Sequence, residues 1–102
     1  MPERLLLSAA ISLVLVRPAA ADDAKIETGR RIYGDYCATC HGENLQNNSG
    51  VAYDLRRLRE SERARFVDAV MNGKKAMPSW KGALGDDKIG ALWAYIRANA
   101  YP

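Results

Sequence analysis

The sequence predicts an all-α domain of about three to four helices. Three stretches carry apolar residues at three- and four-residue steps, the period of a helix, and no stretch reads as a strand. The segments between them are polar or rich in glycine, as connecting loops are. Without the N-terminal 21 residues, about 80 of the 102 residues remain, which is one domain by length. A Cys-x-x-Cys-His motif directly after the first stretch predicts that the helices pack around a tethered group rather than around side chains alone.

The N-terminal segment has the layout of a secretory signal peptide. A short charged start precedes a mostly apolar run from Leu5 to Val16, and Ala19 and Ala21 supply the small residues of an A-x-A-like cleavage site. The apolar run is about a dozen residues long, too short to span a bilayer as a helix. We therefore expect residues 1–21 to be cleaved after export, leaving residues 22–102. An uncleaved membrane anchor is the alternative.

The first helix of the exported domain is expected from about Ala24 to Tyr36. One face carries residues at helical spacing, namely Ile26, Gly29, Tyr33 and Cys37. The segment from Gly42 to about Leu58 is rich in asparagine, serine and glycine, which predicts a loop.

Two further helices follow. The second is expected to begin near Ser61, a good N-cap residue, and to end at Gly73. The third opens at Gly85-Asp86-Asp87, and its stripe lies at i, i+3, i+4 and i+7: Ile89, Leu92, Trp93 and Ile96. Gly90 lies inside this helix at a cost of about 1 kcal/mol relative to alanine. It either allows a close helix crossing or is simply tolerated.

The motif Cys37-Ala38-Thr39-Cys40-His41 is the attachment signature of c-type haem. Two thiols at this spacing add to the two vinyl groups of the porphyrin, and the adjacent imidazole can bind iron as the proximal ligand. A thioredoxin-like pair would need a βαβ unit. Structural zinc would need four Cys or His ligands, whereas the chain has three. A disulfide would not need His41, which is the only histidine.

Export and haem attachment support each other, because covalent attachment takes place outside the cytoplasm in bacteria. A domain of about 80 residues usually needs a cross-link or a bound group to complete its core, and a covalently attached haem supplies one. We expect one covalently bound haem c per chain. The formal charge of +3 falls to +2 without residues 1–21, which carry Arg4, Arg17 and Glu3. Two haem propionates bring it near zero, so the charge gives no reason to expect a nucleic-acid partner.

Met77 is the expected distal ligand of the iron. It lies on a loop between Gly73 and Pro78, and a thioether is a soft donor that raises the reduction potential of haem. Met71 is the competitor, but its helical spacing with Phe66, Val67 and Val70 favours core packing.

The order of export signal, helix with Gly29 and Tyr33, Cys37-x-x-Cys40-His41, Met77-Pro78 and terminal helix resembles the small monohaem class I cytochromes c. The resemblance covers residues 22–102 and implies the small cytochrome c fold. It also implies that Gly29 and Tyr33 pack on the last helix, at Leu92 and Tyr95. In the family, a carbonyl near a Gly-Pro step accepts the N–H of the histidine. The corresponding stretch here, Gly50 to Leu55, has no proline, so the residue that supplies the carbonyl is open.

With His41 and Met77 on both sides of the iron, the resemblance implies a soluble periplasmic one-electron carrier rather than an enzyme. Donors and acceptors would be redox proteins, such as a quinoprotein alcohol dehydrogenase and a terminal oxidase. The alternative is a labile Met77, with the haem acting in small-ligand sensing or peroxidase-like chemistry. Three lysines flank the Met77 loop and either steer an acidic partner or are ordinary solvated charges: Lys74, Lys75 and Lys81. No stable membrane insertion is expected after cleavage.

Overall fold

A computed structural model describes residues 18–47 and 52–102, and this part of the chain is helical. Its α-helices are α1 (Pro18–Tyr36), α2 (Ala38–His41), α3 (Arg63–Asn72) and α4 (Asp86–Ala98). Between α2 and α3, the described residues form three 3₁₀ turns: η1 (Glu43–Leu45), η2 (Leu55–Arg57) and η3 (Glu60–Glu62). The described ranges contain no strand beyond an isolated bridge in the loop after α3. The all-α prediction is confirmed.

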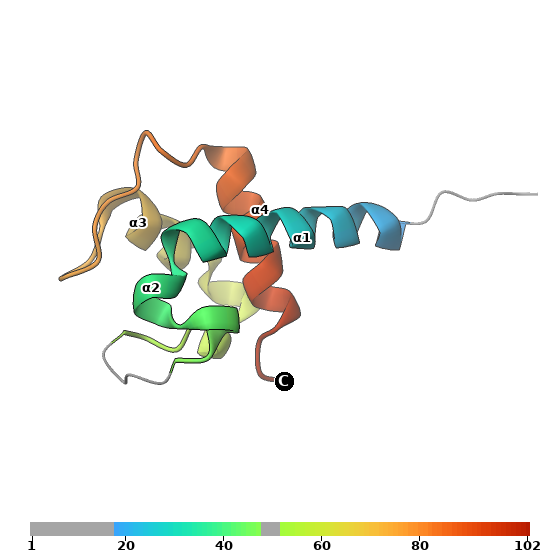
Figure 1. The fold of residues 1–102 in the computed structure, drawn as a ribbon, viewed down its shortest axis with the longest axis horizontal. Helices are drawn as coiled ribbons and strands as arrows, with labels where there is room; N and C mark the ends of the chain where they lie inside the picture. Colours follow the sequence, from blue (N-terminus) through green and yellow to red (C-terminus); the bar gives the residue numbers. More distant parts are fainter. Residues whose placement is uncertain (1–17, 48–51) are drawn as a thin grey trace, which may run out of the picture.

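The close crossing of α1 and α4 organises the fold (Figure 1). At Gly29 the two backbones approach so closely that a Cβ atom would lie 2.0 Å from the carbonyl oxygen of Ala91 and 2.8 Å from Cβ of Tyr95. One turn later, the ring of Tyr33 packs on that of Tyr95, with centroids 5.5 Å apart. The expected packing of Gly29 and Tyr33 on the last helix is confirmed at Tyr95, and the nearest backbone to Gly29 is that of Ala91.

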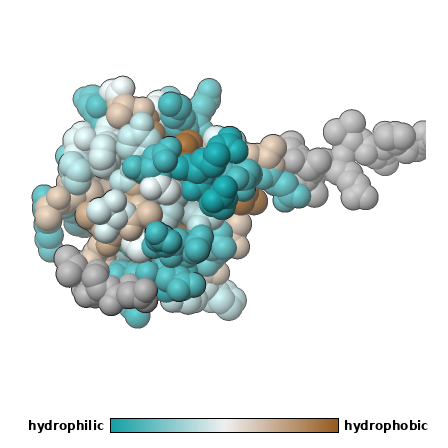
Figure 2. Space-filling view, viewed as in Figure 1, coloured by the Kyte–Doolittle hydropathy of each residue, from teal (hydrophilic) through white to brown (hydrophobic). Residues whose placement is uncertain are grey.

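The core lies around this crossing and extends to α3. Phe66 of α3 packs on Trp93 of α4, with ring centroids 5.2 Å apart. The largest fully buried side chains are Tyr33, Leu45, Leu84, Leu92, Ile96 and Val70. Among the described residues no polar or charged side chain is buried. The face drawn in Figure 2 is accordingly mostly hydrophilic or neutral, with hydrophobic colour confined to small patches.

Helix α1 begins six residues earlier than the expected Ala24. It includes positions 18–21 of the expected signal peptide, while residues 1–17 lie outside the described part. Alanine is the best helix former, and the run Ala19-Ala20-Ala21 extends the helix although its first turns project beyond the body of the domain (Figure 1). In the described part of the chain, no helix has the length and apolar character needed to cross a membrane.

The start of α3 corrects the N-cap expected at Ser61. The turn η3 comes first, and the Glu62 carboxylate accepts the N–H of Arg59 at 2.9 Å, so α3 begins at Arg63. The cap of this turn is therefore a glutamate side chain that reaches back three residues, and its N-cap is Arg59. Gly73 ends α3 with a φ of 79°, as expected.

Helix α4 begins at Asp86 after Gly85, as predicted. A Cβ atom at Gly90 would meet only the ends of the Arg63 and Lys25 side chains, at 3.7 and 3.8 Å. Gly90 is therefore tolerated, and the close crossing depends on Gly29.

Gly29→Ala tests this crossing. The added methyl group must push α1 away from the α4 backbone, and overpacking of this kind costs about 1–3 kcal/mol, with the upper end expected here. Gly34 is the matched control on the same helix, because a Cβ atom there meets nothing within 4 Å. Gly34→Ala should stabilise the protein by up to about 1 kcal/mol. Denaturant unfolding of both variants measures the difference, and equal stability of the two would contradict the close packing.

Candidate haem site

Cys37, Cys40 and His41 lie on one turn of the chain. The carbonyl oxygen of Cys37 accepts the N–H groups of Cys40 at 3.2 Å and His41 at 2.9 Å. Helix α2, with Cys37 as its N-cap, therefore fixes how the three residues are arranged in space. Cys37 is buried and Cys40 is exposed. Burial, with a smaller contribution from Cys40, raises the pKa of the Cys37 thiol to about 12. The free thiol at Cys37 is therefore neutral at pH 7.

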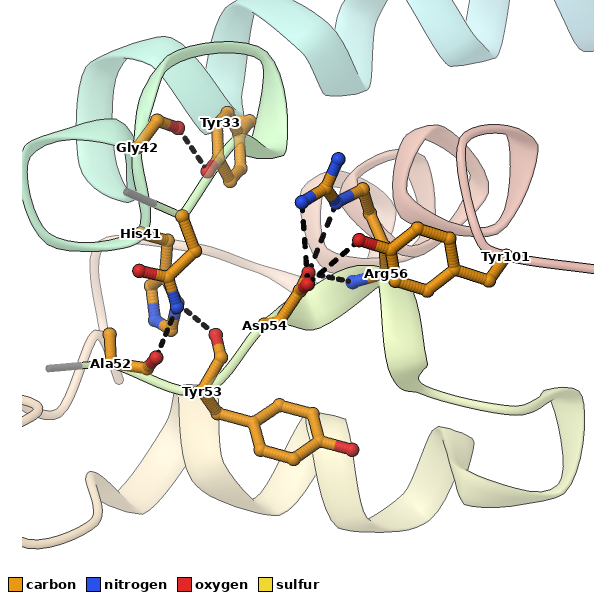
Figure 3. Close-up of polar contacts among 9 residues, drawn as sticks. Tyr33, His41, Gly42, Ala52, Tyr53, Asp54, Arg56 and Tyr101 are labelled. Carbon is orange, nitrogen blue, oxygen red and sulfur yellow. Dashed lines mark hydrogen bonds and ion pairs between the residues drawn. The ribbon is translucent and has the colours of Figure 1, made fainter. Parts of the chain in front are cut away.

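The His41 ring is oriented by a backbone carbonyl. Its Nδ1 lies 2.9 Å from the carbonyl oxygen of Tyr53 (Figure 3). Because a carbonyl only accepts, this contact requires the proton on Nδ1, and in the neutral ring the lone pair of Nε2 is then available to a metal. Tyr53 lies within the stretch from Gly50 to Leu55, so the structure assigns the carbonyl that the sequence left open.

The chain reverses directly after His41. Gly42 has a φ of 92°, and a Cβ atom there would lie 1.9 Å from the carbonyl oxygen of Gln46. Tyr33 donates its hydroxyl proton to the carbonyl oxygen of Gly42 at 2.5 Å. Burial is the main reason that the pKa of Tyr33 is raised well above its ordinary value, so this donor stays protonated. The α1–α4 crossing is thus connected to the histidine turn.

The loop that supplies the Tyr53 carbonyl is held by polar contacts that the sequence analysis did not single out. The Asp54 carboxylate accepts the backbone N–H of Arg56 at 3.0 Å, its Nε at 3.1 Å and the Tyr101 hydroxyl at 3.0 Å. The backbone N–H of Tyr101 in turn donates to the Arg56 carbonyl at 2.9 Å. The spacing Asp-x-Arg, typical of a capped turn, is the signal that could have found Asp54.

Met77 comes from a different segment, the loop between α3 and α4. The N–H and carbonyl groups of Lys74 and Met77 bond to each other at 2.9 and 3.0 Å, which closes the loop. The N–H of Trp80 donates to the Val70 carbonyl at 2.8 Å and ties the loop to α3. Met77 and Met71 are both half-buried, so burial alone does not show which of the two is the better candidate ligand.

An aromatic contact joins the two segments. Tyr36, the residue before Cys37, meets Trp80 edge-on, with ring centroids 5.2 Å apart. Other half-buried apolar side chains also lie against the core: Ile26, Ala38, Leu55, Val67, Met71 and Met77. Two thiols and an imidazole on one turn, a soft thioether on a closed loop and apolar surroundings together fit a c-type haem. Within the described ranges no three His, Cys, Asp or Glu side chains gather as ligands for an ion such as zinc.

Comparison with known proteins identifies the family. The sequence profile described as cytochrome c oxidase, cbb3-type, subunit III, matches residues 24–96. The chain belongs to the small monohaem class I c-type cytochromes. Cytochrome c6 from Tetradesmus obliquus is 34% identical over 87 residues, which cover 76% of this chain and 93% of that protein. No solved structure matches significantly.

Other relatives of this cytochrome are much longer proteins. Subunit CcoP of the cbb3-type oxidase from Azospirillum brasilense is 31% identical over 86 residues, 76% of this chain. Quinohemoprotein alcohol dehydrogenase ADH IIB from Pseudomonas putida is 26% identical over 88 residues, 83% of this chain. The matched part is only 29% of the oxidase subunit and 13% of the dehydrogenase. The small cytochrome c fold is thereby confirmed, and the family implies haem c.

Asp54 should make the stability of this cytochrome depend on pH. Desolvation opposes its ionisation, but hydrogen bonds from Arg56 and Tyr101 outweigh it, so the folded-state pKa of Asp54 is lowered. A lowered folded pKa contributes stability that is fully present above the unfolded pKa of ~3.9 and is lost as the pH falls through the folded value.

The comparison with Asp54→Asn isolates this contribution, because asparagine cannot titrate and the other carboxylates are common to both proteins. The stability advantage of the wild type should be constant above about pH 5 and should shrink as the pH is lowered towards about 2. Thermal unfolding across this range measures it. An advantage that stays the same at low pH would mean that Asp54 has no lowered pKa in the folded protein.

Proposed function

We propose that this cytochrome is an exported one-electron carrier rather than an enzyme. In this proposal Cys37 and Cys40 hold one haem c by thioether bonds, and His41 and Met77 are its axial ligands. The observation that carries the proposal is the contact between His41 Nδ1 and the Tyr53 carbonyl at 2.9 Å. This contact occupies Nδ1 and supports a role for Nε2 in binding a metal on the same turn as the two thiols.

The cysteine turn supports covalent attachment. Each thiol would add across one vinyl group, its sulfur bonding to carbon and its proton moving to the neighbouring carbon, so no oxidant is needed. Helix α2 fixes the arrangement of the two cysteines in space, and His41 lies on the same turn directly after Cys40. One such motif in the chain supports one haem.

The Met77 loop supports a closed distal side. Its paired bonds with Lys74 and the bond from Trp80 to Val70 hold it against α3. A neutral thioether favours ferrous iron and so raises the reduction potential. When bound between His41 and Met77, haem supplies an iron that exchanges one electron at the edge of the macrocycle. With two protein ligands, no axial position remains for a substrate.

Export and partner choice belong to the same proposal. The signal-peptide layout of residues 1–21 supports a periplasmic location. The match to nearly all of a cytochrome c6 supports a separate carrier, and the matches within oxidase and dehydrogenase chains support partners of those two classes. The lysines beside Met77 are exposed and can attract an acidic surface.

Stopped-flow mixing with a purified quinoprotein alcohol dehydrogenase and a purified terminal oxidase tests both partners. If the cytochrome exchanges electrons with neither protein, the assignment of these two partner classes is wrong.

Met77→Leu tests the distal ligand, with Met71→Leu as the matched control. Leucine has nearly the volume of methionine but no donor atom, so packing changes should cost less than about 1.5 kcal/mol at either position. The wild type and Met71→Leu should show a low-spin ferric spectrum with the weak far-red methionine–iron band. Met77→Leu should lose that band, and its reduction potential should fall because the thioether is gone.

The same spectra test the alternative function. A carrier with both axial ligands in place binds cyanide or azide only at high concentration. A high-spin ferric wild type that shifts readily with azide at low concentration would favour small-ligand sensing or peroxidase-like chemistry and would overturn the carrier proposal. Loss of the far-red band in Met71→Leu instead of Met77→Leu would exchange the roles of the two methionines.

A further inference from the structure

Tyr101, which follows helix α4, contacts the loop that supplies the Tyr53 carbonyl at two points. Its hydroxyl donates to the Asp54 carboxylate at 3.0 Å, and its backbone N–H donates to the Arg56 carbonyl at 2.9 Å. The guanidinium of Arg56 lies over the Tyr101 ring, 4.9 Å from its centroid. Figure 3 shows these residues converging on the Asp54 carboxylate, one residue from the Tyr53 carbonyl.

These contacts lie next to the peptide that contains the Tyr53 carbonyl. The carbonyl of Tyr53 and the N–H of Asp54 belong to one rigid peptide plane, so a rotation of the Asp54 backbone turns the carbonyl with it. The Asp54 side chain accepts from Arg56 and Tyr101, which holds Asp54 at a φ of −77° and a ψ of 104°. On the other side of Tyr53, the Asn47 side chain donates to the Ala52 carbonyl.

The ion pair in this arrangement is sheltered. The side chains of Asp54 and Arg56 are only 20% and 24% exposed, whereas the pair between Glu27 and Arg30 on α1 is about half exposed. A sheltered pair with additional hydrogen bonds holds its geometry better than an exposed one, which exchanges with water.

We propose that Tyr101 and Asp54 are positioning residues for His41, acting through the Tyr53 carbonyl to set the reduction potential of the protein. The inference rests on the proposed function, because it requires His41 to bind iron. A firmly held acceptor on Nδ1–H increases the basicity of the imidazole, and a stronger donor favours ferric iron. Loosening the carbonyl therefore raises the reduction potential.

Tyr101→Phe is the main test, because it removes the hydroxyl bond to Asp54 without changing the charge. Direct loss of such a supporting partner typically costs about 10- to 100-fold in metal affinity, and a residue that acts through another should cost less. We expect the equilibrium constant for reduction to rise by about threefold, which is about 30 mV at ~59 mV per tenfold for one electron. The His41 Nδ1–H should also exchange faster with solvent in NMR spectra.

Two substitutions of Asp54 provide the second test, because both remove the same charge. Asp54→Asn keeps an oxygen that can accept from Arg56 or Tyr101, whereas Asp54→Ala keeps none. The potential should rise further in Asp54→Ala than in Asp54→Asn, and Nδ1–H exchange should follow the same order. Glu27→Gln is the control for loss of a carboxylate elsewhere, and it should leave Nδ1–H exchange unchanged.

The outcomes separate this inference from the carrier proposal. A wild type without the low-spin methionine-ligated spectrum overturns the proposed function and this inference with it. A normal wild-type spectrum with unchanged potential and Nδ1–H exchange in Tyr101→Phe overturns the positioning role alone. Equal potentials in Asp54→Ala and Asp54→Asn also overturn it, because they leave only a charge effect. Unfolding midpoints are measured alongside, since a purely structural role would lower stability without moving the potential.

Discussion

The close approach of two backbones at Gly29 is the constraint on which the rest of the structure depends. Any side chain at that position would collide with the Ala91 carbonyl, so α1 and α4 cross only because glycine is there. The crossing buries Tyr33 against Tyr95 and directs its hydroxyl to the Gly42 carbonyl. The helix crossing is thereby connected to the turn that contains the histidine.

The two sides of the candidate haem site are built by different means. On the histidine side, three segments distant in sequence meet: the Cys37–His41 turn, the loop at Tyr53 and the segment after α4 that contains Tyr101. On the methionine side, one local loop is closed by its own backbone bonds and tied to the end of α3. The Tyr36–Trp80 ring contact connects the two sides. The histidine side therefore depends on the whole fold, whereas the Met77 loop depends mainly on its neighbours.

Sequence reasoning succeeded where the signal is local or periodic. The stripe on α4 needed only spacing, the cysteine–histidine motif indicated the family that the comparison identifies, and the pairing of Gly29 with the last helix followed from the family resemblance. It failed where a choice depends on tertiary contacts or on competing caps. Ser61 is a good N-cap residue in isolation, but in the structure the Glu62 carboxylate accepts the Arg59 N–H and caps the turn there. The pairing of Asp54 with Tyr101 joins residues 47 apart, which no local pattern shows. The residue whose carbonyl accepts the His41 N–H could be narrowed to the stretch from Gly50 to Leu55 but not to Tyr53, because every residue in that stretch has a carbonyl.

The central claim is that one imidazole and one thioether of this chain bind the same iron. X-ray absorption at the iron edge of the holo protein tests it most directly. The account predicts a sulfur neighbour together with nitrogen neighbours, and loss of the sulfur when Met77 alone is replaced by leucine. An iron environment without sulfur in the wild type, or one that keeps its sulfur after that replacement, would contradict it.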